Sequence, residues 1–310
     1  MSQQYAYLRG EFLPLEQATI NVRTHAFLYG TAVFEGIKAY WLPETSEIAV
    51  FRIFEHYQRL CQSSHILRLD VPLSIEEMID LTLQLVQKNL CRQDTYIRPI
   101  VYKADLRIGP ILKVPDTQDD FCLFTVPMAG YLDTAKGIHV GVSPWRRLDD
   151  NAIPARAKVN GAYVNTALAK TDGALCGFDD VVVLTNEGHV AEGSAMNLFL
   201  VRNGELITSP ISDNILEGIT RQSIIELASR ELGIKTTCRP IDRTELYIAD
   251  EAFFVGTATE VAPIVKFDHR HVGKGVVGEI TLQIQELYAK AIHGALPQYD
   301  QWVTKVKIPG

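Results

Sequence analysis

Apolar and polar residues alternate along much of the first half of the chain, in the two-residue period of half-buried strands. Helical periodicity replaces this alternation at residues 55–67 and 74–90, and Ser74 opens the second run as a candidate N-cap. Pro, Gly and Asp residues at 104–120 predict a loop. Strands are expected at 5–13, where a glycine turn separates two of them, and at 33–41, 48–53, 95–102 and 121–128.

The second half of the chain is richer in predicted strands. Asn203-Gly204 predicts a tight hairpin, because both residues tolerate positive φ. Gly233 predicts the end of a helix. Strands are expected at 138–145, 181–185, 195–201, 205–209, 235–240 and 252–255, and helices at 161–174, 219–232 and 276–294.

The mixture of helices and strands predicts an α+β protein, and a length of 310 residues predicts two domains. We place a smaller α/β domain at 1–127, a connection at 128–137 and a larger domain at 138–310. The net charge of −7 argues against general nucleic-acid binding. The chain has no apolar run long enough for a signal peptide or a membrane span. We therefore expect a cytoplasmic protein with neither nucleic-acid nor membrane partners.

Neither the cysteines nor the histidines have the spacing of metal ligands, so the sequence predicts no metal site. We expect the cysteines to be buried free thiols. His269 and His271 belong to a polar turn and are expected to face solvent. The cysteines are Cys61, Cys91, Cys122, Cys176 and Cys238, and the other histidines considered are His25, His56, His65 and His189.

Lys158 lies among small and apolar residues just before a predicted helix. Loss of solvent disfavours an ammonium there, and a neutral amine is the form that attacks a carbonyl group. The simpler interpretation is one solvated lysine among 13. Glu192 interrupts an apolar run. If buried, it needs a cationic partner such as a protonated pyridine nitrogen; otherwise it is a strand-edge carboxylate that faces water.

Two glycine-containing segments have the pattern of anion sites. Gly218 precedes a predicted helix whose first turn contains Ile219 and Thr220, so amides and a hydroxyl lie at the positive end of the helix dipole. The turn at 255–263 adds two threonine hydroxyls and further amides. Ordinary helix starts and turns show the same patterns.

Two arginines lie in apolar surroundings, Arg59 in a predicted helix and Arg98 in a predicted strand. Strand alternation puts Tyr96 and Arg98 on one face, where a phenol and a guanidinium can bind a carboxylate together. A structural salt bridge is the alternative. The residues of VFEGIKAY remain ambiguous at this level.

Six segments follow one another along the chain: YGTAVFEGIKAY (29–40), the Tyr96-x-Arg98 strand, AKVNGAY (157–163), EGSAMNLF (192–199), LEGIT (216–220) and GTATEV (256–261). Together they resemble the class IV aminotransferases of pyridoxal-phosphate (PLP) fold type IV, and within them the branched-chain amino-acid aminotransferases. The resemblance covers nearly the whole sequence. It implies two α/β domains with pyridoxal 5′-phosphate at their interface, and pyridoxamine phosphate as the aminated form of the cofactor.

The resemblance implies roles around the cofactor. Lys158 would bind it as a Schiff base and then move a proton between the substrate Cα and the cofactor C4′. Tyr163 matches the phenol that hydrogen-bonds the ring oxygen, and Glu192 the carboxylate paired with the pyridine nitrogen. Arg52 has no such role. The phosphate site is matched by Arg59, Gly218, Ile219, Thr220 and Thr257.

The same resemblance implies substrate contacts. The turn at Thr257 and Ala258 would hold the α-carboxylate with help from Tyr96, and Arg98 would meet the distal carboxylate of glutamate. One pocket would then accept either a branched apolar side chain or a γ-carboxylate. The residues matched to the pocket lining are Tyr29 from the partner subunit, Phe34, Gly36, Met128 and Tyr131.

The implied reaction is reversible ping-pong transfer of an amino group from L-leucine, L-isoleucine or L-valine to 2-oxoglutarate. The implied assembly is a homodimer with shared active sites, or a larger oligomer such as a hexamer. Met128 stands where some relatives have tryptophan, and Val159-Asn160 replaces a pair of small residues. The 104–118 loop, which closes over the substrate in relatives, matches no known pattern. These departures bear on the breadth of the side-chain pocket.

Other proteins of this fold would keep Lys158, Glu192 and the phosphate site. The Tyr96-x-Arg98 strand disfavours a D-amino-acid aminotransferase or an R-selective amine transaminase, because the D-enzymes use an Arg-x-His carboxylate trap. An aminodeoxychorismate lyase would lack the FEGIKAY context. A non-enzymatic interaction protein would bind no chromophore.

Overall fold

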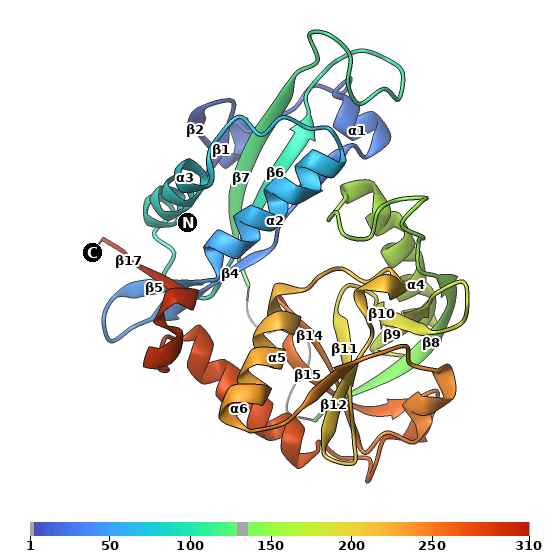
Figure 1. Cartoon of the computed structure of the whole chain (residues 1–310). Helices are drawn as coiled ribbons and strands as arrows, with labels where there is room; N and C mark the ends of the chain where they lie inside the picture. The colour runs from blue at the N-terminus through green and yellow to red at the C-terminus, as the bar shows by residue number, and fades with distance from the viewer. Residues whose placement is uncertain (1–2, 129–135, 310) are drawn as a thin grey trace. The chain divides into compact units, whose positions relative to one another are not determined.

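The computed structural model describes residues 3–128 and 136–309, which divide into two compact units (Figure 1). The first unit comprises Met1–Ala129, Ala157–Gly161 and Ala291–Gly310, and the second comprises Gly130–Arg156 and Ala162–Lys290. Two segments that the sequence pattern assigned to the second domain, 157–161 and 291–310, thus belong to the first unit. The predicted connection at 128–137 lies mostly outside the described residues.

The first unit contains an antiparallel sheet with eight strands among the described residues. Its main path runs β17-β5-β4-β6-β7-β1-β2, and β3 pairs with β6 beside β4. The strands are Tyr5–Leu8 (β1), Glu11–Pro14 (β2), Ala32–Phe34 (β3), Ile37–Leu42 (β4), Glu47–Phe51 (β5), Thr95–Lys103 (β6), Asp119–Pro127 (β7) and Val303–Lys307 (β17). The β17–β5 pairing explains why the C-terminal segment belongs with this unit.

The single strand predicted at 33–41 is interrupted at Glu35-Gly36, between β3 and β4. Both pieces pair with β6 in one continuous register, Phe34 with Ile100 and Ile37 with Ile97. The Glu35 backbone N–H donates to the carbonyl of Pro99 at 3.0 Å, but a proline has no N–H to return to the ladder. The proline in the neighbouring strand therefore explains the interruption.

Two long helices of the first unit, Ile53–Ile66 (α2) and Ile75–Lys88 (α3), lie beside the sheet (Figure 1). Ser74 caps α3 as predicted, in a capping box with Glu77. Helix α2 starts earlier than predicted, because Arg52 has left-handed backbone geometry (φ 48°) and ends the preceding strand. A short helix at His25–Tyr29 (α1) was not predicted.

The second unit contains a mixed sheet with nine strands among the described residues. Its order is β10-β9-β8-β15-β14-β11-β12-β13, and β16 pairs with β15. The pairs β8–β9, β8–β15 and β12–β13 are parallel, and the others are antiparallel. The strands are Ile138–Arg146 (β8), Asp180–Leu184 (β9), Val190–Gly193 (β10), Asn197–Arg202 (β11), Glu205–Thr208 (β12), Thr236–Cys238 (β13), Glu251–Gly256 (β14), Glu260–Phe267 (β15) and Arg270–His271 (β16).

The Asn203-Gly204 hairpin is confirmed, with both residues at positive φ (51° and 77°) between β11 and β12. Strand β15 was not predicted, because Pro263 interrupts its apolar run. Its pairing with β8 begins at Ile264, one residue after the proline, so the missing N–H falls outside that ladder. A buried core from β8, β11, β14 and β15 supports the sheet.

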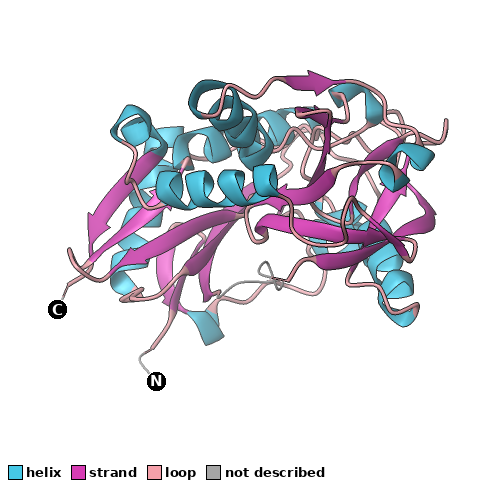
Figure 2. Ribbon diagram, turned by 90° about the horizontal axis from the view of Figure 1, so that it is seen from below, coloured by secondary structure: helices cyan, strands magenta, loops and turns pink. Residues whose placement is uncertain are grey.

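The helices of the second unit confirm the predicted ones within a few residues. Helix Tyr163–Leu175 (α4) packs on β8 and β9, and Ile219–Glu231 (α5) packs on β13 and β14. The last helix is Glu279–Ile292 (α6). Helices and strands of both units are distinguished in Figure 2. Among the described residues, no helix is both long and apolar enough to cross a membrane.

Candidate active site

Lys158 is held in the first unit by backbone contacts on both sides. Its carbonyl accepts from the N–H of Phe34 at 3.0 Å, and its own N–H donates to Ser63 Oγ at 3.2 Å. An isolated bridge between Val33 and Val159 extends the contact with β3. The lysine is half-buried. The backbone of Lys158 is thus fixed between β3 and α2, whereas its side chain takes no part in these backbone contacts.

Phe34 lies close to two cationic groups. The Lys158 Nζ is 4.9 Å from the centre of the Phe34 ring, and the Arg98 guanidinium carbon is 4.2 Å from it. Arg98 Nη2 donates to the Tyr96 hydroxyl at 2.8 Å. This contact confirms that Tyr96 and Arg98 share a face of the strand. It brings four of the predicted site residues, Phe34, Tyr96, Arg98 and Lys158, into one cluster.

Gly36 lies directly beneath the Tyr96 side chain. A Cβ atom at position 36 would be 2.2 Å from the Tyr96 hydroxyl oxygen, closer than any real contact. Only glycine fits here without moving the phenol. The glycine of FEGIKAY therefore sets the position of Tyr96.

Glu35 is fully buried and binds two side chains of α2. Arg59 donates to it through Nε at 2.6 Å and Nη2 at 2.7 Å, and His56 Nδ1 lies 2.7 Å from its second oxygen. Burial raises the pKa of Glu35, but the Arg59 charge and the hydrogen bonds from His56 and Arg59 outweigh it and hold the pKa well below its usual range. Burial lowers the pKa of His56, and the charges of Arg59 and Lys158 add to this effect, whereas Glu35 opposes it.

We therefore assign a neutral His56 that donates Nδ1–H to an ionised Glu35. Arg59, predicted for the phosphate site, has a bidentate contact with Glu35. The sequence alone had left the role of Glu35 open. Arg52, the arginine without a predicted role, pairs with Glu55 and lies over the Trp302 ring.

Two more of the residues matched to the pocket lining belong to the first unit. Tyr29 ends α1, and its hydroxyl accepts from the Gly109 N–H at 3.0 Å. His25 Nε2 lies 2.9 Å from the Gly109 carbonyl. Helix α1 thus contacts both the N–H and the carbonyl of Gly109 in the loop after β6. Met128 is half-buried at the end of β7. Tyr131 lies outside the described residues.

Glu192 is buried in the second unit, which rules out a carboxylate that faces water. It lies on β10, an edge strand, where Arg147 Nη2 is 3.0 Å from Oε1. Asn197 Nδ2 and the Leu216 N–H donate to Oε2 at 3.0 and 3.2 Å. The requirement for a cationic partner was predicted correctly. Arg147 as that partner was missed, because it lies 45 residues earlier in the chain.

Asn197 connects Glu192 with the segment before α5. Besides its bond to Glu192, its Nδ2 donates to the Leu216 carbonyl at 3.0 Å. A Cβ on Gly218 would lie 2.0 Å from Asn197 Oδ1, so the glycine is needed for this close approach. Gly218 is the N-cap of α5, and among the described residues it makes no side-chain cap bond to the first turn, which contains Ile219 and Thr220. Asn197 was not among the predicted site residues, although a polar residue within the apolar run MNLFLV could have indicated it.

The turn at 257–259 joins β14 to β15 and contacts the same segment. Thr259 Oγ1 donates to Met196 Sδ at 3.0 Å, and a Cβ on Gly256 would meet Met196 at 3.5 Å. Thr257 and Ala258 are half-buried. Tyr163, also half-buried, begins α4, and Thr166 of this helix donates to the Ser194 carbonyl at 3.0 Å. The stretch 194–197 thus links the helix and the turn to Glu192.

The cysteine prediction was partly wrong. All five are free, and Cys91 is buried, but Cys176 and Cys238 are exposed. Cys176 is the C-cap of α4, and Cys238 ends the edge strand β13. His269 and His271 are exposed in the β15–β16 hairpin, as predicted. Among the described residues, no group of His, Cys, Asp or Glu is arranged to hold a metal ion.

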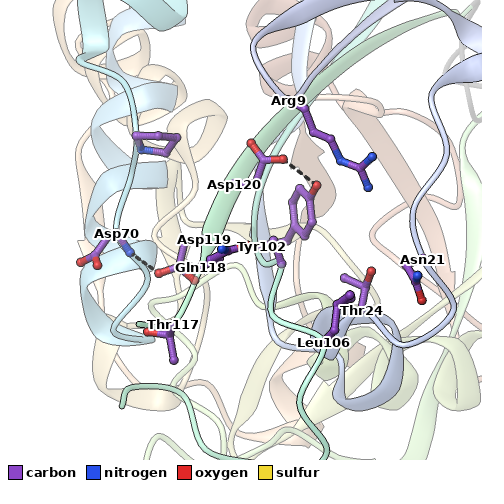
Figure 3. A pocket seen from close by; sticks show the side chains of 12 residues that line it. Arg9, Asn21, Thr24, Asp70, Tyr102, Leu106, Thr117, Gln118, Asp119 and Asp120 are labelled. Carbon is purple, nitrogen blue, oxygen red and sulfur yellow. Dashed lines mark hydrogen bonds between the residues drawn. The ribbon is translucent and has the colours of Figure 1, made fainter. Parts of the chain in front are cut away.

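A hollow of about 690 Å³ on the first unit shares no residue with this site (Figure 3). Its acidic groups already have partners within the protein. Asp119 pairs with the buried Lys103 at 2.6 Å and accepts from the Asp70 N–H at 2.8 Å. Tyr102 donates to Asp120 at 2.8 Å. The hollow therefore does not require a ligand.

Each unit, taken by itself, contains polar groups suited to a part of pyridoxal 5′-phosphate. Glu192 is a buried carboxylate suited to a pyridinium, α5 presents an uncapped N-terminus suited to a phosphate, and Lys158 supplies an amine. Within the described residues, Asn160 Oδ1 and Ser194 Oγ are buried without a hydrogen-bond partner. Buried polar atoms of this kind need a ligand or water.

Comparison with known proteins gives one consistent result. The chain matches the family model described as amino-transferase class IV over residues 32–267. A probable branched-chain-amino-acid aminotransferase of Aquifex aeolicus (strain VF5) is 45% identical and covers 98% of this chain and 97% of its own length. The branched-chain aminotransferase of Thermoproteus uzoniensis, solved with norvaline, superposes with a TM-score of 0.92 at 38% identity, over 98% of this chain and 99% of that one. The PLP form of the enzyme from Thermobaculum terrenum gives 0.92 at 34% identity, over 98% of each chain.

Proposed function

The chain belongs to the class IV amino-transferases, and on this premise we propose that it is a branched-chain-amino-acid aminotransferase. It transfers the amino group of L-leucine, L-isoleucine or L-valine to 2-oxoglutarate, with pyridoxal 5′-phosphate as cofactor. One observation carries the proposal within the site: Phe34 provides an apolar ring beneath the Arg98 guanidinium and beside the Lys158 amine. An apolar substrate side chain can pack on the Phe34 ring, and a distal carboxylate can pair with Arg98.

The bound cofactor supplies an electron sink for the bonds at the substrate Cα. Lys158 would hold the cofactor through its amine, and the same amine would serve as the acid and base that moves a proton at the substrate Cα. Glu192 accepts the hydrogen bond of a protonated pyridine nitrogen, which its burial and ionic contacts support. Tyr163 donates to the ring oxygen.

The phosphate is bound by the amides at the start of α5 and by Arg59, Thr220 and Thr257. The uncapped N-terminus of α5 supports this assignment, because its first amides and the helix dipole attract an anion. Arg59 adds a cation whose orientation is fixed by Glu35.

The α-carboxylate of the substrate is bound by the turn at Thr257 and Ala258 together with the Tyr96 hydroxyl. The distal carboxylate of glutamate or 2-oxoglutarate is bound by Arg98, whose buried Nε has no partner among the described residues. The branched side chain occupies the apolar surface at Phe34. Dual recognition thus follows from one aromatic ring and one guanidinium.

The active form is a homodimer or a larger oligomer to which a second copy brings Tyr29. The surface of α1 and of the loop around Gly109 supports this, because it exposes large apolar side chains, among them Phe27 at 67% and Ile108 at 80%. Light scattering should give at least twice the chain mass of 34.6 kDa. A monomer of full activity would contradict a shared site.

A donor panel tests the substrate class. L-leucine, L-phenylalanine, D-alanine and R-1-phenylethylamine are each supplied with 2-oxoglutarate, and glutamate formation is measured. We expect turnover with L-leucine to exceed the others. Turnover of D-alanine alone would instead indicate a D-amino-acid aminotransferase, and activity confined to the amine would indicate an R-selective transaminase.

A further inference from the structure

Arg147 lies beyond the end of β8 and makes an ion pair with the buried carboxylate of Glu192. The guanidinium is itself largely shielded, with 13% of its side chain exposed. A charge pair this far from water interacts more strongly than a pair at the surface. Arg147 is outside the six sequence motifs quoted above, and none of the predicted cofactor contacts involves it.

Arg147 is held at two further points. Its backbone N–H donates to the Leu184 carbonyl at 2.9 Å, and its Nε donates to the Asn214 carbonyl at 2.8 Å. Asn214 has left-handed backbone geometry (φ 59°), and its side chain donates to Asp149 at 3.1 Å. With the backbone and Nε fixed, the terminal nitrogen is directed at Glu192. An arginine held in this way can fix the orientation of the Glu192 carboxylate.

The other charged groups near Glu192 have their own partners. Asp180 accepts from the Ser194 N–H at 3.3 Å and from Lys170 on α4 at 3.0 Å. Glu217, next to Leu216, pairs with Arg156 at 3.2 Å in an exposed contact. Asn197 and the Leu216 amide, which contact Glu192 directly, are neutral.

We propose that Arg147 is a positioning residue for the cofactor, which keeps Glu192 ionised and oriented before the pyridine ring arrives. The inference rests on the proposed function, since it assumes that Glu192 meets the pyridine nitrogen. A buried carboxylate without a cation takes up a proton more readily. A protonated Glu192 cannot form an ion pair with a pyridinium, so loss of Arg147 weakens cofactor binding most at low pH.

The test uses the cofactor-free protein and pyridoxal 5′-phosphate as the probe. The dissociation constant is measured by visible absorbance at pH 6, 7.5 and 9 for the wild type, Arg147→Gln and Arg147→Lys. Arg202→Gln is the matched control, because it removes another partly buried arginine–carboxylate contact of the same unit, with Glu245 at 2.9 Å. Circular dichroism and thermal unfolding of each cofactor-free variant check that it is folded.

We expect Arg147→Gln to bind at least tenfold more weakly than the wild type at pH 6 and within threefold at pH 9. The dissociation constants of Arg147→Lys and Arg202→Gln should stay within threefold of the wild-type value at all three pH values. The double variant Arg147→Gln/Glu192→Gln should lose the pH dependence, because no carboxylate is left to titrate; it also keeps the test available if Arg147→Gln alone does not fold.

Equal affinity of Arg147→Gln and wild type at every pH would overturn the inference. A loss that is constant with pH would also overturn it, because a purely structural role predicts that result. A wild type that takes up no cofactor would contradict the proposed function instead.

Discussion

Phe34 has two neighbours of the same charge, the Lys158 amine and the Arg98 guanidinium. An aromatic face attracts cations, so one ring can stabilise both groups. The Tyr96 hydroxyl gives Arg98 a second fixed contact. In the proposed function, the reactive amine of Lys158 and the carboxylate-binding guanidinium of Arg98 thus both contact the ring of Phe34.

Replacement of Arg98 by leucine should weaken recognition of the distal carboxylate and leave recognition of the branched apolar side chain intact. The KM for 2-oxoglutarate should rise about 10- to 100-fold, because a charged hydrogen-bond partner is lost. The KM for L-leucine and the visible band of the bound cofactor should change little. Steady-state kinetics with both substrates measure this. An equal rise in both KM values would show that Arg98 has no selective role.

Single residues of the site were predictable where their chemistry is unusual for their surroundings. Glu192 in an apolar run is such a case: the sequence left open whether it is buried or faces water, and the structure buries it. Arg147 and Asn197 were missed, because their importance lies in contacts between segments far apart in the sequence. Glu35 was ambiguous for the same reason, since its partners are on α2.

At the scale of elements, Glu35 ties the interruption between β3 and β4 to helix α2. Its carboxylate receives the Arg59 guanidinium and the His56 ring, and no part of it is exposed. Removal of one partner from a buried charge pair leaves an uncompensated charge. The contact therefore fixes the helix against the sheet as well as the orientation of Arg59.

Glu35→Gln should lower the free energy of unfolding by about 3 kcal/mol, because Arg59 loses its buried counter-charge. Glu55→Gln is the control on the same helix, since it removes the more exposed partner of Arg52 and should cost about 1 kcal/mol or less. Denaturant unfolding followed by circular dichroism measures both. Equal losses in the two variants would contradict a special role for Glu35.

The elements with strong periodicity or specific turn residues were predictable. The Ser74 cap and the Asn203-Gly204 hairpin are local signals and are confirmed. The interruption at Glu35-Gly36 was not predictable, because it depends on Pro99 in a neighbouring strand. Strand β17 and its pairing with β5 depend likewise on a contact between distant parts of the chain.

At the scale of the whole molecule, stability should depend on pH through paired carboxylates such as Glu245. Hydrogen bonds from Arg239 lower the pKa of Glu245 to about 2 against the opposing effect of burial, and Arg202 adds to the lowering. The unfolded pKa is higher, near 4.5. This contribution to stability is thus fully present above pH 4.5 and is lost as the pH falls toward 2.

Glu245→Gln should therefore destabilise the protein by about 2 kcal/mol at pH 7, with a smaller difference from the wild type as the pH falls below 4.5. Glu205→Gln, which removes an exposed and longer contact with Lys235, should change stability little at either pH. Urea unfolding at pH 7 and pH 4 gives the comparison. A difference that grew in acid would contradict the assignment.

The position of the Schiff base tests the central claim most directly. The cofactor-loaded protein is reduced with borohydride and digested, and the phosphopyridoxyl group is located by mass spectrometry, with Lys158→Ala as the control. We predict the group on Lys158 of the wild type and on no peptide of the variant. A wild type that carries the group on another lysine, or that carries none, would contradict the account.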